Sequence, residues 1–423
     1  MRHFMNLNQN MKTYLLPLIA IFAFNNLDAQ ENTIIIPRSS DSRVITTAVP
    51  FLLIAPDARA AGMADMGVAT STDAYSQLWN PSKYVFSESK SGIGVSYTPY
   101  LSQLVNDIFL GNLTYYNRIN EQSAFAASFR YFSLGEIELR DFAEQQPLIE
   151  QPNELTFDLS YSLRLAQQFS MGVSLRYLRS DLRIRDEFEN VQSAGSFGVD
   201  IAGYYQSEEQ AYNDFNGRTR LGFAIQNIGP SISYDDNPTG EPNFIPTTLR
   251  LGGGFDFIFD DYNTLSVTAE VTKLLVPTPP QFGDEYIDEN NDGVIDDDEF
   301  AAGPVRERVI FAGESNDVGF LSGIFQSFGD APGGFSEELK EFTWALGAEY
   351  LYQDSFAFRA GYFNESDDKG ARKFFALGAG FKYTTINIDL SYLFSASRVR
   401  SPLENTLRFS LSFNFAEGEY REY

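Results

Sequence analysis

The chain has 423 residues, and its 57 Asp and Glu outnumber its 31 Lys and Arg, which gives a formal net charge of −26 at pH 7. The phosphates of nucleic acid repel such an acidic chain, so nucleic acid is not expected among its partners. Its mean hydropathy is −0.23 and no run of about 20 apolar residues occurs, which excludes a membrane protein built from helices.

The near absence of cysteine and histidine limits which catalytic and metal sites the protein can contain. The chain has no cysteine, and its one histidine, His3, lies close to the start. Disulfides, the usual zinc sites and nucleophiles activated by histidine are therefore excluded from the expected mature chain. We interpret the protein as a non-enzyme.

Residues 1–29 have the layout of a secretory signal peptide. Lys12 provides the positive charge, and residues 14–24 (YLLPLIAIFAF) provide an apolar run that is too short to span a bilayer. Ala29 is the expected cleavage point, and Met11 is an alternative start of the chain.

Residues 30–89 precede the first segment with a strand pattern. Small residues dominate here, Asp73 and Asn80 suit helix caps, and Pro81 suits a first helical turn. We expect this segment to fold as a hatch into the lumen of a barrel formed by residues 90–423. A periplasmic extension is the alternative.

Residues 90–423 contain about fourteen segments in which apolar and polar residues alternate. One of the clearest is the last, Thr406–Phe415 (TLRFSLSFNF), because strict alternation gives a strand one face for lipid and one for a polar interior. The expected strands are Gly92–Tyr97, Ile108–Tyr116, Ala124–Phe132, Leu155–Leu165, Phe169–Leu178, Ser196–Tyr205, Thr219–Asn227, Thr248–Phe259, Leu265–Lys273, Thr343–Tyr352, Phe356–Asn364, Phe374–Tyr383, Ile386–Phe394 and Thr406–Phe415. We predict an all-β membrane protein, an antiparallel outer-membrane β-barrel of about 14 strands with an N-terminal lumenal hatch.

The connections between these segments alternate in length. Long ones include residues 133–154 and 274–342, short ones include 166–168 and 384–385, and residues 206–218 are an exception. Outer-membrane barrels carry long loops outside the cell and short turns in the periplasm. We therefore predict an integral protein of the bacterial outer membrane, in contact with its lipid, whose long loops are exposed at the cell surface.

Charged residues of both signs fall on the inward face of the predicted strands. They are Arg130, Asp158, Arg164, Arg176, Asp200, Arg220, Arg250, Asp256, Glu270, Glu349, Arg359, Lys382, Asp389 and Arg408. An unpaired buried charge is costly, so we favour charges that pair with one another across a filled lumen. A polar conduit through the barrel is the alternative.

The segment before the first strand carries a family resemblance. Residues 61–81 contain G-x-x-x-x-G-V-A, D-A and N-P elements and resemble the hatch of the FadL-type transporter superfamily. Over Ile45–Phe86 the sequence resembles more narrowly the PorV (LptO) family, outer-membrane barrels of the type IX secretion system of Bacteroidetes. The resemblance covers the layout of the mature chain and is specific only in these residues.

This resemblance implies a function in protein transport. Members of the family receive cargo from a giant outer-membrane translocon barrel, bind its C-terminal signal domain and escort it to a surface attachment complex. Two other functions stay open: FadL-like transport of fatty acids or other hydrophobic solutes, and lipid A deacylation, which the missing histidine disfavours. The sequence identifies no cargo-binding residues.

Residues 288–299 (DENNDGVIDDDE) match the calcium-loop pattern D-x-[DN]-x-[DN]-G-x5-E in full. The expected ligands are Asp288, Asn290, Asp292, the carbonyl of Val294, Asp296 and Glu299. Prolines and glycines on both sides argue against an ordinary pair of flanking helices. Calcium is the expected cofactor and would order an acidic loop; a solvated acidic turn is the alternative.

Later in the same loop, residues 317–328 (DVGFLSGIFQSF) are apolar and contain glycines. Phe320, Leu321, Ile324 and Phe325 would share one face of a short helix. Such a face either contacts a partner protein or packs on the mouth of its own barrel.

Overall fold

The computed structural model describes residues 32–38, 42–140, 142, 146–182, 193–234, 243–397 and 402–417. The predicted signal peptide, residues 1–29, lies outside this part of the chain. The chain divides into two compact units. The first unit comprises Met1–Asp41 and Gln281–Ala312, and the second comprises Ser42–Pro280 and Gly313–Tyr423.

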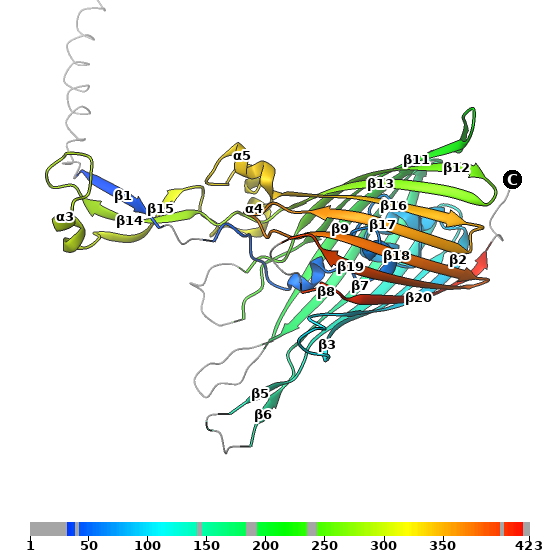
Figure 1. The fold of residues 1–423 in the computed structure, drawn as a ribbon, viewed down its shortest axis with the longest axis horizontal. Coiled ribbons are helices and arrows are strands. Elements are labelled where there is room, and N and C mark those ends of the chain that lie inside the picture. The colour runs from blue at the N-terminus through cyan, green and yellow to red at the C-terminus, as the bar shows by residue number, and fades with distance from the viewer. Residues whose placement is uncertain are drawn as a thin grey trace, which may run out of the picture. The chain divides into compact units, whose positions relative to one another are not determined.

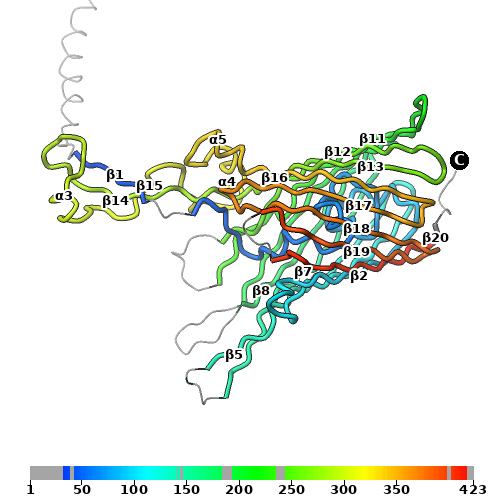
Figure 2. Tube along the Cα trace, viewed as in Figure 1, coloured from blue at the N-terminus to red at the C-terminus, as the bar shows by residue number. Residues whose placement is uncertain are grey.

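Within the described residues, the second unit forms a closed antiparallel barrel of fourteen strands (Figures 1 and 2). The strands are β2 (Ser89–Pro99), β3 (Ile108–Arg118), β4 (Ser123–Leu134), β7 (Asn153–Ala166), β8 (Phe169–Asp181), β9 (Ala194–Gln206), β11 (Asn216–Ile228), β12 (Thr248–Asp260), β13 (Asn263–Leu274), β16 (Phe342–Tyr352), β17 (Phe356–Asn364), β18 (Lys373–Tyr383), β19 (Ile386–Ser395) and β20 (Leu407–Glu417). Each pairs with the next in this order, and β2 pairs with β20 to close the barrel. The predicted fold class and strand positions are confirmed.

The alternation of side chains follows the prediction. In β7, Thr156 and Asp158 are buried on the inward face, whereas Phe157 and Leu159 are exposed on the outward face. Barrel closure leaves no strand edge unpaired, so the backbone hydrogen-bonding groups are satisfied while the outward face stays apolar for lipid.

The connections separate the two ends of the barrel. One end, here called the long-loop end, carries residues 135–152 between β4 and β7 and residues 229–247 between β11 and β12. The other, the short-turn end, carries turns such as 261–262 and 384–385. The exception at 206–218 extends β11 through a hairpin with β10 (Gln210–Ala211). At the long-loop end, β5 (Ile137–Leu139) pairs with β6 (Leu148–Glu150).

Residues 42–88, here called the lumenal segment, contain only short helical elements. These are η1 (Pro50–Leu53), α2 (Ala58–Ala61), η2 (Ser76–Leu78) and η3 (Pro81–Phe86). Asn80 caps η3, since its side-chain oxygen accepts from the backbone N–H of Ser82 (3.2 Å), and Pro81 occupies the first helical position, as predicted. Asp73 accepts from the backbone N–H of Tyr75 (2.9 Å) just before η2.

Inward-facing glycines of the strands make room for the lumenal segment. A Cβ at Gly222 of β11 would lie 2.2 Å from the carbonyl oxygen of Val68. A Cβ at Gly361 of β17 would lie 2.5 Å from the carbonyl carbon of Met63. The backbone of the segment therefore runs against the inner wall, where a larger side chain would collide with it.

The first unit is a small sheet built from distant parts of the chain. Strand β14 (Gln281–Ile287) pairs with β1 (Thr33–Pro37) on one side and with β15 (Arg306–Ala312) on the other. The segment predicted as residues 30–89 is therefore divided between the two units. The predicted long loop, residues 274–342, is likewise not one irregular loop but contains two strands of this sheet.

The rest of that connection belongs to the second unit and is here called the cap, residues 313–341. It contains α4 (Phe320–Gln326), α5 (Phe335–Glu338) and η4 (Leu339–Glu341) and leads directly into β16 at the long-loop end. In the described part of the chain, no helix is long and apolar enough to cross a membrane.

The lipid-facing wall gives a depth-dependent prediction. Leu159 lies at the middle of β7 and Leu165 near its short-turn end, and both side chains are exposed. We expect Leu159→Arg to lower the unfolding free energy in lipid bilayers by about 2–4 kcal/mol, because the charge lies at the hydrocarbon midplane, and Leu165→Arg by about 0–1 kcal/mol. Reversible denaturant unfolding from bilayers measures both values. Equal costs at the two positions would contradict the predicted position of the membrane.

Candidate functional site

The inward-facing charges form a paired network. All but Arg164, Arg250 and Lys382 of the predicted set are buried. The pairs are Arg130–Asp158, Arg176–Asp158, Arg176–Asp200, Arg220–Asp256, Arg250–Glu270, Arg359–Glu349, Arg359–Asp389 and Arg408–Asp65. Arg164 lies 4.9 Å from the ring centre of Phe86. The preferred interpretation of packed and paired lumenal charges is confirmed.

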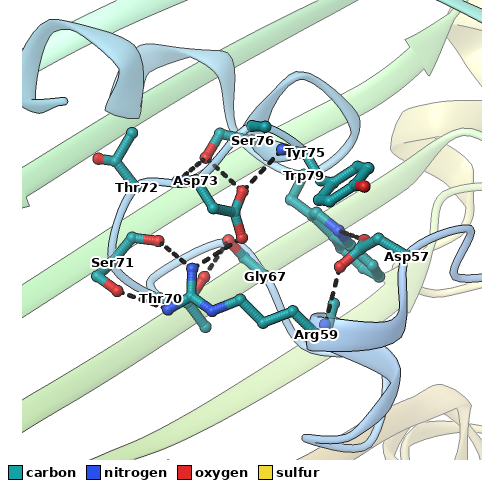
Figure 3. A network of polar contacts seen from close by, with 12 residues as sticks. Asp57, Arg59, Gly67, Thr70, Ser71, Thr72, Asp73, Tyr75, Ser76 and Trp79 are labelled. Atoms are coloured by element: carbon teal, nitrogen blue, oxygen red, sulfur yellow. Dashed lines mark hydrogen bonds and ion pairs between the residues drawn. The ribbon is translucent and has the colours of Figure 1, made fainter. Parts of the chain in front are cut away.

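Arg59 of α2 joins the lumenal segment to the wall; Figure 3 shows its contacts within the segment, with Ser71 and Asp73. Its Nη2 lies 2.8 Å from a carboxylate oxygen of Glu349 in β16, and its Nη1 lies 2.7 Å from Asp73. The same guanidinium donates to the carbonyl oxygen of Ser71 (3.1 Å) and to its hydroxyl (2.6 Å). Glu349 also pairs with Arg359 of β17, so one buried carboxylate balances a cation from the segment and one from the barrel.

Asp57 and Lys83 hold the segment together from within. Asp57 caps α2 by accepting from the backbone N–H of Ala60 (2.8 Å) and also accepts from the indole N–H of Trp79 (2.7 Å; Figure 3). The Lys83 ammonium donates to the carbonyl oxygen of Gly67 (2.8 Å) and to the Thr70 hydroxyl (3.1 Å). These bonds connect α2 to Trp79 and Lys83 to the turn at Gly67–Thr70 within the lumenal segment.

The predicted calcium ligands lie in the first unit, from the end of β14 to Glu299 in the first turn of α3 (Asp297–Ala302). The Asp288 carboxylate accepts from the backbone N–H of Gly293 (2.9 Å), which has a φ of 84°. Asp296 caps α3 in a reciprocal capping box with Glu299. The loop is therefore followed by a helix, as in an ordinary calcium loop, but is preceded by a strand.

The ligand side chains hydrogen-bond the loop backbone instead of meeting at one point. Glu299 accepts from the backbone N–H groups of Glu289 (2.7 Å) and Asp296 (3.0 Å), and the Asp292 carboxylate accepts from that of Val294 (2.8 Å). Within the described residues, no group of three or more carboxylates is arranged to hold a metal ion. All of the predicted ligand atoms are oxygens, the type of ligand that calcium prefers.

The cap presents apolar side chains at the long-loop end. The helix predicted in residues 317–328 is present as α4, and its Gly323 is buried against Pro277 and Phe244. The large exposed apolar side chains of the cap are Leu321, Phe325, Phe328, Phe335 and Leu339. Helix α4 thus contacts the barrel mouth through Gly323, whereas Leu321 and Phe325 of the predicted apolar face are exposed.

Buried and half-buried ion pairs hold the cap to the barrel and are here called the cap lock. Its pairs are Lys273–Glu341, Lys273–Glu338, Lys369–Glu341, Lys369–Glu337 and Arg43–Glu337. They join the end of β13, the connection between β17 and β18, the cap and the start of the lumenal segment. Thr278 adds a hydroxyl donor to Glu341 (2.6 Å).

The lock changes the ionisation of its carboxyl groups. Burial opposes ionisation of Glu337, but hydrogen bonds from Arg43 and Lys369 outweigh it and lower the pKa of Glu337 to about 2. The pKa of Glu341 is also lowered, because hydrogen bonds from Lys273, Thr278 and Lys369 outweigh its burial. Burial raises the pKa of Asp330, whose carboxylate accepts from the backbone N–H of Thr278 (2.9 Å), to about 6.

Sequence reasoning found the inward charges of the strands and missed the cap lock and the role of Arg59. The alternation of a strand predicts which of its side chains face inward. It does not predict which groups of the cap or of the lumenal segment contact them. A charged residue in a run of small residues, as Arg59 is between Ala58 and Ala60, was the available indication.

The lowered pKa values predict how the cap responds to acid. A carboxylate whose pKa is lowered on folding stabilises the fold above its ordinary pKa, here 4.5, and this stabilisation is lost as the pH falls toward the folded value of about 2 for Glu337. We expect hydrogen-exchange protection of the cap, corrected for intrinsic rates, to rise from pH 8 to about 5, because Asp330, whose pKa is raised to about 6, takes up its proton more readily in the folded cap, and to fall below about pH 4 as Glu337 is protonated. Glu337→Gln should lower the protection at neutral pH. Protection that is unchanged at about pH 3 would show that the lock does not hold the cap.

A family model described as type IX secretion system protein PorV matches residues 37–281, more than half of the chain. The match contains the whole lumenal segment and the strands from β2 to β13. No curated protein sequence matches the chain.

Several solved structures resemble the chain at low identity. The Pseudomonas putida toluene transporter TodX is 11% identical, with 85% of this chain and 97% of that chain covered and a TM-score of 0.48. A Pseudomonas aeruginosa FadL homologue is 14% identical, with 89% and 100% covered and a TM-score of 0.44. The Ralstonia pickettii toluene transporter TbuX is 12% identical, with 86% and 98% covered and a TM-score of 0.44.

The strand pairing, rather than these distant likenesses, establishes the barrel. The family match extends from the lumenal segment through β13. It therefore covers both the hatch-like residues and the alternating strands on which the sequence prediction was based. The chain belongs to the PorV family and is an outer-membrane component of the type IX secretion system.

Proposed function

We propose that the protein binds the C-terminal signal domain of cargo that has crossed a giant outer-membrane translocon barrel and escorts it to a surface attachment complex. The family match over residues 37–281 carries this proposal. The long-loop end then faces the outside of the cell, where translocated cargo emerges, and the short turns face the periplasm.

The cap is the proposed cargo-binding surface. The side chains of Phe325 and Phe335 are 77% and 78% exposed. Phenylalanine is among the residues that folded proteins most often bury. Exposed apolar patches on otherwise polar surfaces mark protein contacts. The cap lock supports this role, because a surface held in place loses less conformational entropy when a partner binds.

The protein acts without catalysis in this proposal. The described lumenal charges are engaged with one another, and no histidine or cysteine follows the expected signal peptide. FadL-like solute transport and lipid A deacylation are the competing functions, and both are outcomes of the test below.

We expect Phe325→Ser together with Phe335→Ser to lower the amount of cargo recovered with the purified protein at least tenfold. Each change removes a ring that cargo would cover, and hot-spot aromatic residues contribute about 2 kcal/mol or more, where 1.4 kcal/mol is a factor of ten in affinity. Quantitative mass spectrometry after gentle extraction from native membranes measures the recovery. Leu104→Ser is the matched control, because Leu104 is 79% exposed at the same end of the barrel but outside the cap.

A deletion strain separates the competing functions. The proposal expects secretion of proteins with C-terminal signal domains to fail while lipid A mass spectra stay unchanged. Normal secretion with impaired uptake of a hydrophobic solute would favour transport, and a change in lipid A acylation would favour the deacylase.

We also propose that residues 288–299 bind one calcium ion. Three features support this proposal: the complete spacing, the all-oxygen ligand set and the helix α3, which Asp296 caps at the ninth loop position. The ion would neutralise carboxylates that otherwise repel one another, and would draw Asp288 and Glu299 away from their backbone partners.

Metal analysis tests the calcium proposal. We expect about one calcium per chain in protein purified with about 1 mM calcium, and a loss of that calcium in Asp288→Ala and in Glu299→Ala. Glu307→Ala is the control, since Glu307 is an exposed acidic residue of β15 outside the loop. An equal calcium content in all four proteins would remove the site.

A further inference from the structure

We propose that a groove on the outer wall of the barrel, at the long-loop end, binds the headgroup of a phosphate-bearing membrane lipid. This groove is here called the rim groove. It lies between η4 and the strands β13, β16, β17 and β18, which are neighbours in the barrel (Figure 1). The proposal concerns binding without any cleavage of the lipid, and it does not depend on cargo binding by the cap.

The apolar side of the rim groove belongs to the lipid-facing wall. Val271 of β13 and Trp344 of β16 line the groove, and both side chains are exposed on the outward face of the barrel. Trp344 begins a row of aromatic rings that continues with Tyr362 of β17, 5.5 Å away between ring centres, and with Phe375 of β18, 4.8 Å further on. Rows of aromatic residues mark the depth at which a barrel passes from hydrocarbon to headgroups. The rim groove therefore opens at the level of the lipid headgroups.

Two lysines line the polar side of the rim groove. Lys340 belongs to η4 of the cap, and Lys373 is the first residue of β18, two residues before Phe375 and nearer the long-loop end. Asn364 and Ser366 line the same groove and add neutral N–H and O–H donors. A phosphate at this level would meet cations and donors, while the acyl chains below it would cover the apolar side.

The carboxylates beside these lysines leave donors for a phosphate. The Nζ of Lys340 lies 2.7 Å from Asp368, and the Nζ of Lys373 lies 2.7 Å from Asp367, and both carboxylate side chains are exposed. An ammonium group has three N–H donors, so each of these bonds occupies only one of them. Exposed ion pairs contribute little to the stability of a fold. A phosphate can therefore share each lysine with its carboxylate, or replace the carboxylate, at little cost.

The position of the rim groove favours a lipid over a soluble anion. Its apolar side continues the outward wall, so Val271 and Trp344 are covered only by a ligand that carries acyl chains. Its volume of about 560 Å³ lies within the range of sites that hold small molecules, and a headgroup is of that size. Lysines beside a bilayer attract anionic lipids. These features together select a lipid whose headgroup contains a phosphate.

A lipid bound in the rim groove would join the cap to the barrel. Lys340 comes from the cap and Lys373 from the wall, so a phosphate that contacts both adds a bridge between them. This bridge would lie next to the cap lock, in which the neighbouring Glu341 pairs with Lys369 (2.9 Å). The lipid would therefore support the place at which the cap enters β16.

Quenching of tryptophan fluorescence tests the site, because the chain has two tryptophans and Trp344 is the one in the rim groove. Trp79 is buried in the lumenal segment, and the variant Trp344→Phe measures its background. The purified protein is reconstituted in phosphatidylcholine bilayers that contain a small, equal fraction of brominated phosphatidic acid or of brominated phosphatidylcholine. We expect the phosphatidic acid to quench Trp344 as strongly as about a fivefold larger fraction of the phosphatidylcholine.

Substitutions of the two lysines show whether this preference comes from the rim groove. Lys340→Ser with Lys373→Ser should abolish it, and Lys373→Ser alone, which leaves the cap unchanged, should lower it to about twofold. Lys340→Arg with Lys373→Arg should keep it, because the charges remain. Arg140→Ser with Arg179→Ser is the matched control, since these exposed cations also lie at the long-loop end and pair with carboxylates, but outside the groove. The control should behave as the unaltered protein does.

Three results would overturn the proposal. Equal quenching of the unaltered protein by the two brominated lipids would show that the rim groove does not select the phosphatidic acid. An undiminished preference after both lysines are replaced by serine would assign it to other residues. A preference that the arginine control also loses would assign it to the overall charge of the long-loop end. The recovery of cargo enters none of these measurements, so this proposal and the proposed function fail separately.

Discussion

Every charge that the barrel turns inward must find a partner inside it, and the rest of the structure depends on this constraint. A closed barrel offers water to its outer rims only, so Glu349 and Asp389 are buried and must be balanced by cations such as Arg359. The charges of the wall are not all neutralised by one another. Glu349 also pairs with Arg59 of the lumenal segment, and Arg408 pairs with Asp65 of that segment. The lumenal segment is thus an electrostatic part of the wall as well as its filling.

The need to separate lipid from a packed polar interior also explains why the barrel could be predicted from the sequence. A strand between lipid and a packed polar interior must alternate strictly, as β7 and β20 do, and this pattern is local to each strand. All fourteen strands were therefore predicted to within a few residues, together with the inward side of their charges. The helix caps of the lumenal segment, such as Asn80 before Pro81, were also predictable because a cap is a local feature.

Pairings between distant segments could not be predicted in this way. Strand β1 pairs with β14, so Ile35 meets Glu285, some 250 residues later in the chain, and neither segment carries an alternation that identifies the other. Arg43 and Glu337 of the cap lock are equally remote. The contacts of the lumenal segment with the wall, such as Arg59 with Glu349, are of the same kind, which is why the sequence predicted a hatch but not the residues that hold it.

A barrel whose lumen holds a segment of its own chain keeps the architecture of a channel, but the surfaces it offers to partners lie elsewhere. Its outer wall meets lipid, and its inner wall is occupied by buried contacts such as Arg59 with Glu349, so neither offers a surface to a folded protein. The connections at the long-loop end are what is left. There the cap is held by the same kind of buried ion pair that holds the lumenal segment, and Arg43 and Glu337 connect the two directly. A partner that pulled on the cap would therefore act on the beginning of the lumenal segment, and the paired charges along the lumen are what resists that pull.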